Sequence, residues 1–154
     1  MRVSEVMTNA TVTDQSDDTL AEAARKMWKQ QTGSLLVVEG EDLVGILTER
    51  DVMKAVANGA NLTETRVSEV MSKDLVTVGP GTSLREAAKL MADRWIRHLP
   101  VLDSGKLVGI LSQRDLVGVL AGALNEPDAL TQLVEASELV RERRLRRIEH
   151  GVWD

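Results

Sequence analysis

The sequence predicts an α+β protein made of two βαββα repeats related by pseudo-two-fold symmetry, with an extra helix at the C-terminus. The first observation behind this prediction is an internal duplication: shifted by 64 positions, residues 3–56 align with residues 67–120 without a gap and with 21 identities in 54 positions. The second observation is that each copy alternates strand-like and helix-like patterns in the same order. Two copies are too few for a solenoid, so we expect them to close as a symmetric pair.

Each copy shows the same local signals in order. A short strand is expected at Thr11–Thr13 and again at Leu75–Thr77. Apolar residues then recur three and four positions apart, which predicts a helix; the stripe is Leu20, Ala23, Ala24 and Met27, repeated as Leu84, Ala87, Ala88 and Met91. A hairpin and a second helix complete each copy; the segments are Ser34–Val38, Leu43–Leu47 and Glu49–Ala57, then His98–Leu102, Leu107–Leu111 and Gln113–Ala121.

The C-terminal part has no counterpart in the first copy. Pro127 suits a first helical turn, so one long helix is expected there. Its basic run, Arg141–Arg147, is interrupted by a glutamate and flanked by others, which favours a solvated helix face over nucleic-acid binding. The signals together divide the chain into repeat 1 at residues 1–60, repeat 2 at residues 61–124 and a helical extension at residues 125–154.

Composition excludes several classes of protein. The chain has 154 residues, and its 43% apolar content is enough for a packed core. It has no cysteine, which rules out disulfides, thiolate metal sites and cysteine nucleophiles. The formal net charge of -5 argues against non-specific nucleic-acid binding. The first ten residues do not resemble a signal peptide and no apolar run is long enough to span a bilayer, so a soluble cytoplasmic protein is expected.

A matching tetrad stands where the last strand of each copy meets its second helix: Thr48–Asp51 reads Thr-Glu-Arg-Asp, and Ser112–Asp115 reads Ser-Gln-Arg-Asp. A hydroxyl and unpaired N–H groups at a helix N-terminus can hold a phosphate, and a carboxylate three residues on can accept both hydroxyls of a ribose. The same spacing is also that of a capping box. Gly45 and Gly109, inside the preceding strands, indicate close approach by a ligand or by another backbone.

The doubled string of Val-Ser-Glu-Val-Met, a short strand, an amphipathic helix and Leu-Val-Gly-Ile-Leu-Ser/Thr-x-Arg-Asp resembles the cystathionine β-synthase (CBS) domain pair, over residues 2–121. The resemblance implies a regulatory, non-catalytic module with adenosyl ligands in the clefts between the repeats, and a homodimer. It implies that the aspartates bind ribose, the preceding hydroxyls help to bind phosphate, and the first strand encloses adenine. The expected ligand-binding residues are Thr11, Thr13, Gly33, Ser34, Thr48, Arg50, Asp51, Thr77, Arg97, His98, Ser112, Arg114 and Asp115.

Arg97 and His98 introduce an asymmetry, because the first copy has Gly33 and Ser34 at the same positions. We therefore expect only one cleft to gain these extra donors, and the two sites to differ in affinity or in phosphate number. No cofactor is required; the candidate ligands are AMP, ADP, ATP and S-adenosylmethionine. No metal site, P-loop or catalytic constellation is evident, so an enzyme is not expected. The alternative is an interaction or dimerisation scaffold with vestigial clefts, and the sequence names no protein partner.

Overall fold

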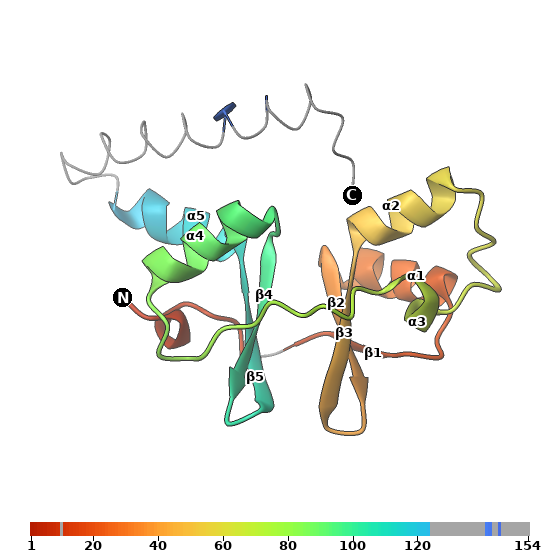
Figure 1. The fold of residues 1–154 in the computed structure, drawn as a ribbon, viewed down its shortest axis with the longest axis horizontal. Coiled ribbons are helices and arrows are strands. Elements are labelled where there is room, and N and C mark those ends of the chain that lie inside the picture. The colour runs from red at the N-terminus through yellow and green to blue at the C-terminus, as the bar shows by residue number, and fades with distance from the viewer. Residues whose placement is uncertain (10, 124–140, 143–144, 146–154) are drawn as a thin grey trace.

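The computed structural model describes residues 1–9, 11–123, 141–142 and 145. It consists of two similar halves, each with a β-hairpin and helices packed beside it (Figure 1). The order of elements is η1 (Val3–Glu5), β1 (Thr13–Gln15), α1 (Leu20–Gln30), β2 (Ser34–Glu39), β3 (Asp42–Thr48), α2 (Glu49–Ala57), α3 (Val67–Val70), α4 (Leu84–Arg94), β4 (His98–Asp103), β5 (Lys106–Ser112) and α5 (Gln113–Ala123). The expected α+β fold with two βαββα-like repeats is confirmed.

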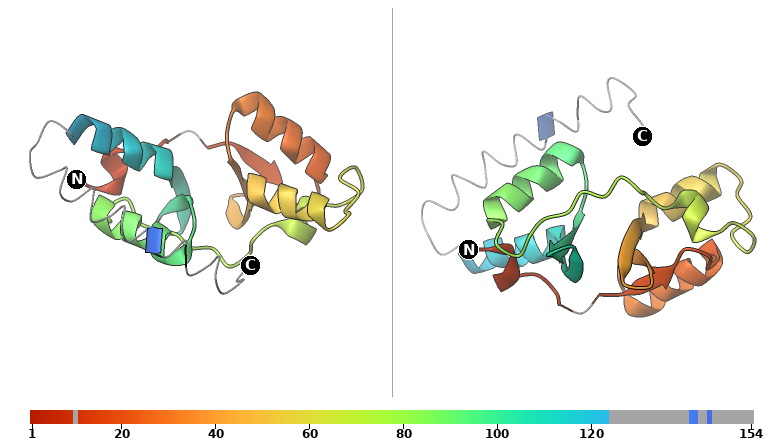
Figure 2. Two further views of the ribbon diagram at one scale, coloured as in Figure 1. Left: turned by 90° about the horizontal axis from the view of Figure 1, so that it is seen from above. Right: turned by 60° about the horizontal axis from the view of Figure 1, so that its bottom comes forward.

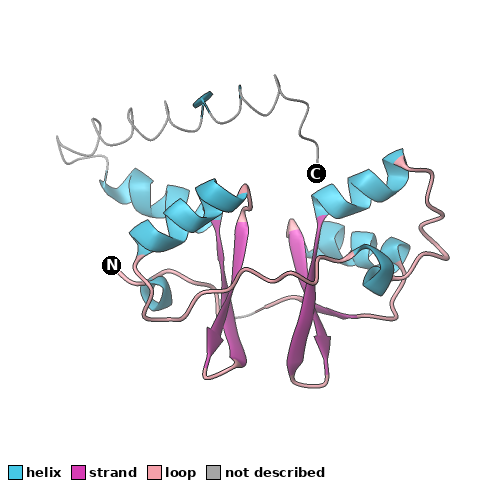
Figure 3. Ribbon diagram, viewed as in Figure 1, coloured by secondary structure: helices cyan, strands magenta, loops and turns pink. Residues whose placement is uncertain are grey.

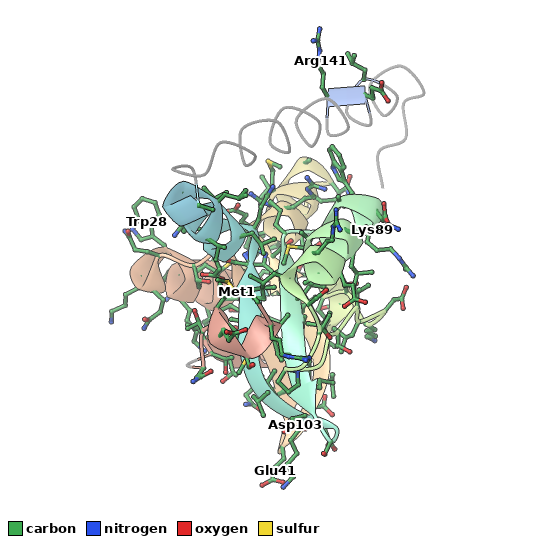
Figure 4. The ribbon with its side chains drawn as sticks, turned by 90° about the vertical axis from the view of Figure 1, so that its left-hand side faces the viewer. Met1, Trp28, Glu41, Lys89, Asp103 and Arg141 are labelled. Atoms are coloured by element: carbon green, nitrogen blue, oxygen red, sulfur yellow. The ribbon has the colours of Figure 1, made fainter. Side chains whose placement is uncertain are left out.

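The longer helices gather at one end of the molecule and the hairpin turns at the other (Figure 3). Glu41 and Asp103, at the tips of the two hairpins, lie at the same end (Figure 4). Both hairpins are antiparallel and carry a register shift at equivalent places, between Val37 and Val38 in β2 and between Val101 and Leu102 in β4. The two repeats therefore share the same irregularity in their hairpins as well as a similar sequence.

The first strand of each repeat differs from its prediction. In repeat 1 it lies two residues later than expected, at Thr13–Gln15, and pairs parallel to β2. In repeat 2 no strand is assigned over Leu75–Thr77; Val78 alone forms a parallel bridge to Val101. Gly79 and Pro80 follow Val78 directly, and proline has no N–H for a ladder, which explains why the pairing stops there.

Two hydrophobic cores form, one for each half. The helical stripes predicted from periodicity supply a face of each core: Leu20, Ala23 and Met27 are buried in the first, and Ala87 and Met91 in the second. Leu35, Val37 and Leu47 from the first hairpin and Leu99, Val101 and Leu111 from the second complete the cores. All of these are aliphatic or methionine residues, in keeping with a sequence that has no Phe and no Tyr.

The two halves exchange their short leading segments. The chain crosses between the halves after η1 and again after α3 (Figure 2). Val3, on η1, is fully buried in the second core, whereas Val67, on α3, is fully buried in the first. The expected division at residue 60 stays a proposal about the sequence repeats, but each core contains a piece of the other repeat.

Matching backbone hydrogen bonds hold the exchanged segments. The N–H of Val3 donates to the carbonyl of Thr82 at 2.9 Å, and the N–H of Val67 donates to the carbonyl of Asp18 at 2.8 Å. Further along, Thr8 exchanges two backbone hydrogen bonds with Ile110 of β5, and Ser72 does the same with Ile46 of β3. Each hairpin thus receives an additional bridge from the segment that crosses over.

Close approach of these crossing segments explains the strand glycines. A Cβ atom at Gly109 would lie 2.8 Å from the carbonyl oxygen of Thr8 and 3.0 Å from the sulfur of Met7. At Gly45 it would collide with the sulfur of Met71 and lie 3.2 Å from the carbonyl oxygen of Ser72. Of the two possibilities left open by the sequence, the structure shows close approach by another backbone at these glycines.

The expected helical extension at residues 125–154 lies outside the described residues, apart from Arg141, Glu142 and Leu145, which are helical and exposed. None of the helices formed by the described residues is both long enough and apolar enough to cross a membrane.

Candidate functional site

The two tetrads at the strand-to-helix junctions form complete capping boxes. The hydroxyl of Thr48 donates to Oδ2 of Asp51 at 2.7 Å, the N–H of Thr48 donates to the same oxygen at 2.7 Å, and the N–H of Asp51 donates back to the hydroxyl at 3.3 Å. Ser112 and Asp115 repeat this geometry. The structure therefore confirms the capping interpretation. It leaves Oδ1 of each aspartate without a hydrogen bond to another described residue.

Surroundings distinguish these two boxes from those of α1 and α4. The box at Thr19 and Glu22 and the box at Ser83 and Glu86 also cap their helices, and hydrogen bonds from the cap lower the pKa of both exposed glutamates. The hydroxyl residue and the aspartate of each tetrad, by contrast, are half-buried and line cavities. Capping therefore accounts for the spacing in all four places, and a cavity accompanies both of the boxes that were predicted as ligand sites.

We name the first cavity the Asp51 cleft. Its volume is about 320 Å³, at the lower end of the range of small-molecule sites. Repeat 1 contributes Ile46 and the capped start of α2, and repeat 2 contributes the other wall. That wall is partly apolar and includes Leu75, Val76, Ile96 and Pro100. An apolar wall facing a helix N-terminus suits a ligand with a flat ring at one end and an anion at the other.

The second cavity, the Asp115 cleft, is related to the first by the pseudo-symmetry. Its volume is about 1050 Å³, and it lies between the start of α5 and a wall from repeat 1 that includes Thr8 and Val12. Trp28 borders it and is 82% exposed, projecting from α1 at the molecular surface (Figure 4). Each cleft thus combines the tetrad of one repeat with the leading segment of the other.

Most of the predicted ligand-binding residues line these clefts. Thr48, Arg50 and Asp51 line the Asp51 cleft, and Ser112, Arg114 and Asp115 line the Asp115 cleft together with Gly33 and Ser34. Thr11, Thr13 and Thr77 are not among the described lining residues, whereas their neighbours Val12 and Val76 are. Successive side chains along extended backbone point to opposite sides, so Val12 and Val76 line the clefts where their neighbours Thr11, Thr13 and Thr77 do not.

Arg97 and His98 line both clefts, which corrects the expectation that they serve only one. His98 begins β4 and Arg97 directly precedes it, and both residues line clefts formed by the two repeats together. The guanidinium of Arg97 forms an ion pair with Glu49 of the other repeat, with 2.7 Å between Nη2 and Oε1. Burial lowers the pKa of His98, and the charge of Arg97 lowers it further. The imidazole is therefore neutral near pH 7 and offers one donor and one acceptor.

Ser34 is a buried polar residue at the Asp115 cleft. The residue is 3% exposed, and its hydroxyl has no hydrogen-bond partner among the described residues. Because buried polar groups are normally satisfied, an unpaired hydroxyl that lines the Asp115 cleft indicates a missing partner there.

Sequence reasoning missed several lining residues, notably Lys54, Arg94 and Trp95 of the Asp51 cleft. Lys54 follows Arg50 by one helical turn, so helix periodicity could have placed it on the same face. Arg94 is the last residue of α4 and Trp95 follows it, and only the fold brings this end of α4 to the tetrad of repeat 1. Among the described residues there is no cluster of three or more potential metal ligands.

Two βαββα repeats with a cleft at each strand-to-helix junction define a tandem pair of α+β domains. The family model of the CBS domain matches residues 3–58 and residues 67–122, and the chain belongs to this family. The CBS domain-containing protein YhcV of Bacillus subtilis is 42% identical over 115 residues, which cover 74% of this chain and 81% of YhcV. Protein MK0525 of Methanopyrus kandleri is 39% identical over 120 residues, 76% of this chain and 61% of that protein.

A solved structure resembles the chain over a similar extent. The CBS domain pair of protein MJ0100, in complex with 5′-methylthioadenosine and S-adenosyl-L-methionine, matches with a TM-score of 0.74 at 26% identity; the match covers 80% of this chain and 98% of the other. YhcV and a solved signal-transduction protein of Burkholderia ambifaria, both matched over most of their length, carry CBS domains, and this chain is likewise a CBS pair.

Proposed function

We propose that this chain is a regulatory module that binds an adenosyl ligand in the Asp51 cleft and in the Asp115 cleft. The observation that carries the proposal is the composition of each cleft: a capped helix N-terminus with an aspartate from one repeat faces an apolar wall from the other. A nucleoside presents the complementary surfaces, a flat ring, a pair of hydroxyls and an anionic or polar tail. The adenosyl ligands held by the MJ0100 pair support the same class of ligand.

The proposed roles follow from which atoms the capping boxes leave unpaired. Oδ1 of Asp51 and Oδ1 of Asp115 accept the ribose hydroxyls, because Oδ2 of each is already used by the cap. The ring packs against Val76 and Ile96 in one cleft and against Val12 in the other. In the Asp115 cleft, the unpaired hydroxyl of Ser34 donates to the ligand or accepts from it.

Regulation follows from where the clefts lie. A ligand in either cleft contacts both repeats, so it stabilises arrangements in which the two repeats are correctly spaced. The ligand shifts the equilibrium toward those arrangements only as far as it binds them more tightly than it binds the other arrangements. The module then transmits occupancy to whatever protein or domain senses that spacing.

We also propose that the chain forms a homodimer through α2 and α5. Met53 and Val56 on α2 are 66% and 55% exposed, and the equivalent Val117 and Leu120 on α5 are 56% and 42% exposed. Exposed apolar side chains at equivalent positions of both repeats form a surface that a second copy of the chain can cover. In a two-fold dimer each subunit contributes this same surface to the interface.

A thermal-shift panel tests the ligand proposal. We expect one or more of AMP, ADP, ATP, S-adenosylmethionine and 5′-methylthioadenosine to raise the melting temperature. A ligand at a hundred times its dissociation constant adds about 2.7 kcal/mol of stability, which for a chain of this size is roughly 5–10 °C.

Asp51→Asn and Asp115→Asn are the matched variants. Asparagine keeps a carbonyl oxygen for the capping hydrogen bonds but lacks the second acceptor oxygen that a ribose requires. We expect each variant to melt close to the wild type without ligand and to lose the shift that its own cleft provides. No shift with any ligand would favour the alternative, an interaction scaffold with vestigial clefts; shifts unaltered in both variants would refute the site.

A further inference from the structure

The duplication allows the two clefts to be compared position by position. At an offset of 64, Arg50 and Asp51 of the Asp51 cleft correspond to Arg114 and Asp115 of the other. The remaining cationic side chains of the Asp51 cleft have no charged counterpart. Lys54 corresponds to Gly118, Arg94 to Gln30 and Arg97 to Gly33.

The described linings therefore differ in charge. The Asp51 cleft has four cationic side chains, Arg50, Lys54, Arg94 and Arg97, against the carboxylates of Asp51 and Asp74. The Asp115 cleft has two cationic side chains, Arg97 and Arg114, against the carboxylates of Glu49 and Asp115. One cleft thus carries an excess of positive charge and the other is balanced.

Ion pairing within the protein increases this difference in charge between the two clefts. Arg97, which both clefts share, is held by Glu49 at 2.7 Å, and Glu49 itself lines the Asp115 cleft. Arg50, Lys54 and Arg94 form no ion pair with another described residue. Their charge is available to an anion that also meets the N-terminus of α2, a nine-residue helix.

We infer that the two clefts bind different classes of adenosyl ligand, an inference that rests on the proposed function. The Asp51 cleft binds a phosphorylated ligand, a nucleotide. The Asp115 cleft binds a ligand without phosphate, such as a nucleoside. Arg50, Lys54 and Arg94 are the residues that recognise phosphate. Arg97 contributes little to this choice, because it is paired and lies between the clefts. The phosphate preference is carried by the end of α4 and the first turns of α2, on opposite walls of the smaller cleft.

Isothermal titration with AMP and with adenosine tests this assignment. The double variant Lys54→Gln/Arg94→Gln removes two cations and places at position 94 the glutamine that repeat 1 has at the equivalent position. Each charge-assisted hydrogen bond to phosphate is worth about tenfold in affinity. We expect the variant to bind AMP at least tenfold more weakly, with a smaller dependence on salt, and to bind adenosine within about twofold of wild type.

Two further variants assign the cleft. Asp51→Asn should remove the strong AMP site and retain adenosine binding, whereas Asp115→Asn should do the reverse. Lys89→Gln, which removes an exposed cation of α4 outside both clefts, is the charge control, and circular dichroism checks folding of each variant.

The outcomes separate this inference from the proposed function. If AMP and adenosine bind equally well in both clefts, or if Lys54→Gln/Arg94→Gln leaves AMP affinity unchanged, the adenosyl module stands and the phosphate assignment is wrong. Loss of the strong AMP site in Asp115→Asn instead of Asp51→Asn also overturns it. If neither compound nor any of the panel binds the wild type, the proposed function falls and the inference falls with it.

Discussion

Asp14, in β1, is a buried carboxylate that the second repeat replaces with Val78. It is 2% exposed; Nζ of Lys26 lies 2.7 Å from its Oδ1 and also donates to the carbonyl of Thr13. Its Oδ2 has no hydrogen-bond partner among the described residues. Burial, reinforced by the neighbouring Asp18, raises the pKa of Asp14 to about 6 in spite of the lysine. The folded protein therefore holds this proton more tightly than the unfolded chain does.

The replacement Asp14→Asn should change how stability depends on pH. A raised pKa contributes stability that is complete below the ordinary value near 4 and is lost as the pH rises through about 6. The free energy of unfolding of the wild type should thus fall relative to that of Asp14→Asn between pH 4 and pH 7, by on the order of 2 kcal/mol. Urea unfolding at pH 4, 5, 6 and 7 measures this difference.

Asp18→Asn is a control of opposite sign. The neighbouring carboxyl of Asp14 and the N–H of Gln15 lower the pKa of Asp18, so Asp18 contributes stability that is present above its ordinary pKa and lost as the pH falls. Relative to Asp18→Asn, the wild type should gain stability as the pH rises through the acid range. Parallel profiles for wild type and Asp14→Asn would show that Asp14 titrates normally.

At the scale of elements, the exchange of η1 and α3 ties each core to the other repeat. Val3 and Val67 are the anchors, both fully buried. The carbonyl of Thr65 also accepts from the first N–H of α1, and the carbonyl of Met1 accepts from the first N–H of α4. The first N–H of each of these helices thus donates a hydrogen bond to a segment of the opposite repeat, in addition to the bonds of the helix's own capping box.

Truncating these anchors should therefore affect the opposite half of the molecule. Val67→Ala, although within the sequence of repeat 2, should lower the free energy of unfolding by roughly 2 kcal/mol and increase hydrogen exchange chiefly in α1 and α2. Val3→Ala is the mirror experiment and should increase exchange chiefly in α4 and α5. Hydrogen exchange read by mass spectrometry measures both. An increase confined to the half that shares the sequence repeat would contradict the packing.

At the scale of the whole molecule, the proposed dimer depends on the exposed apolar residues of α2 and α5. The variant Met53→Glu/Val117→Glu places a charge at the equivalent position of each helix. Light scattering should give twice 16.9 kDa for the wild type and 16.9 kDa for this variant, because burying an unpaired carboxylate is costly.

Lys89→Glu, an exposed change on α4, should leave the dimer intact. A wild type that scatters as a monomer would contradict the dimer proposal, and a dimeric Met53→Glu/Val117→Glu variant would show that the interface lies elsewhere. Either result leaves the clefts within one chain unchanged, because described residues of both repeats line them.

The sequence alone determined the duplication, the order of the elements, the helical stripes and the junctions at which the tetrads lie. These features depend on residues three or four positions apart, or on neighbours within a hairpin, and the hydrogen bonds of a cap or the face of a helix follow from that spacing. Thr48 with Asp51 and Ser112 with Asp115 could be identified for this reason.

Only the tertiary structure decided how the halves combine. The two leading segments are identical over Val-Ser-Glu-Val-Met, so nothing in their local sequence says whether each packs on its own repeat or on the other. That choice depends on contacts between residues far apart in the sequence, such as Val3 with Thr82 and Val67 with Asp18. The same contacts determine the role of Gly109, the position of Arg97 and His98 between both clefts, and the presence of Arg94 in the cleft of Asp51. Long-range pairing of backbone and charge, not local spacing, sets the chemistry of each cleft.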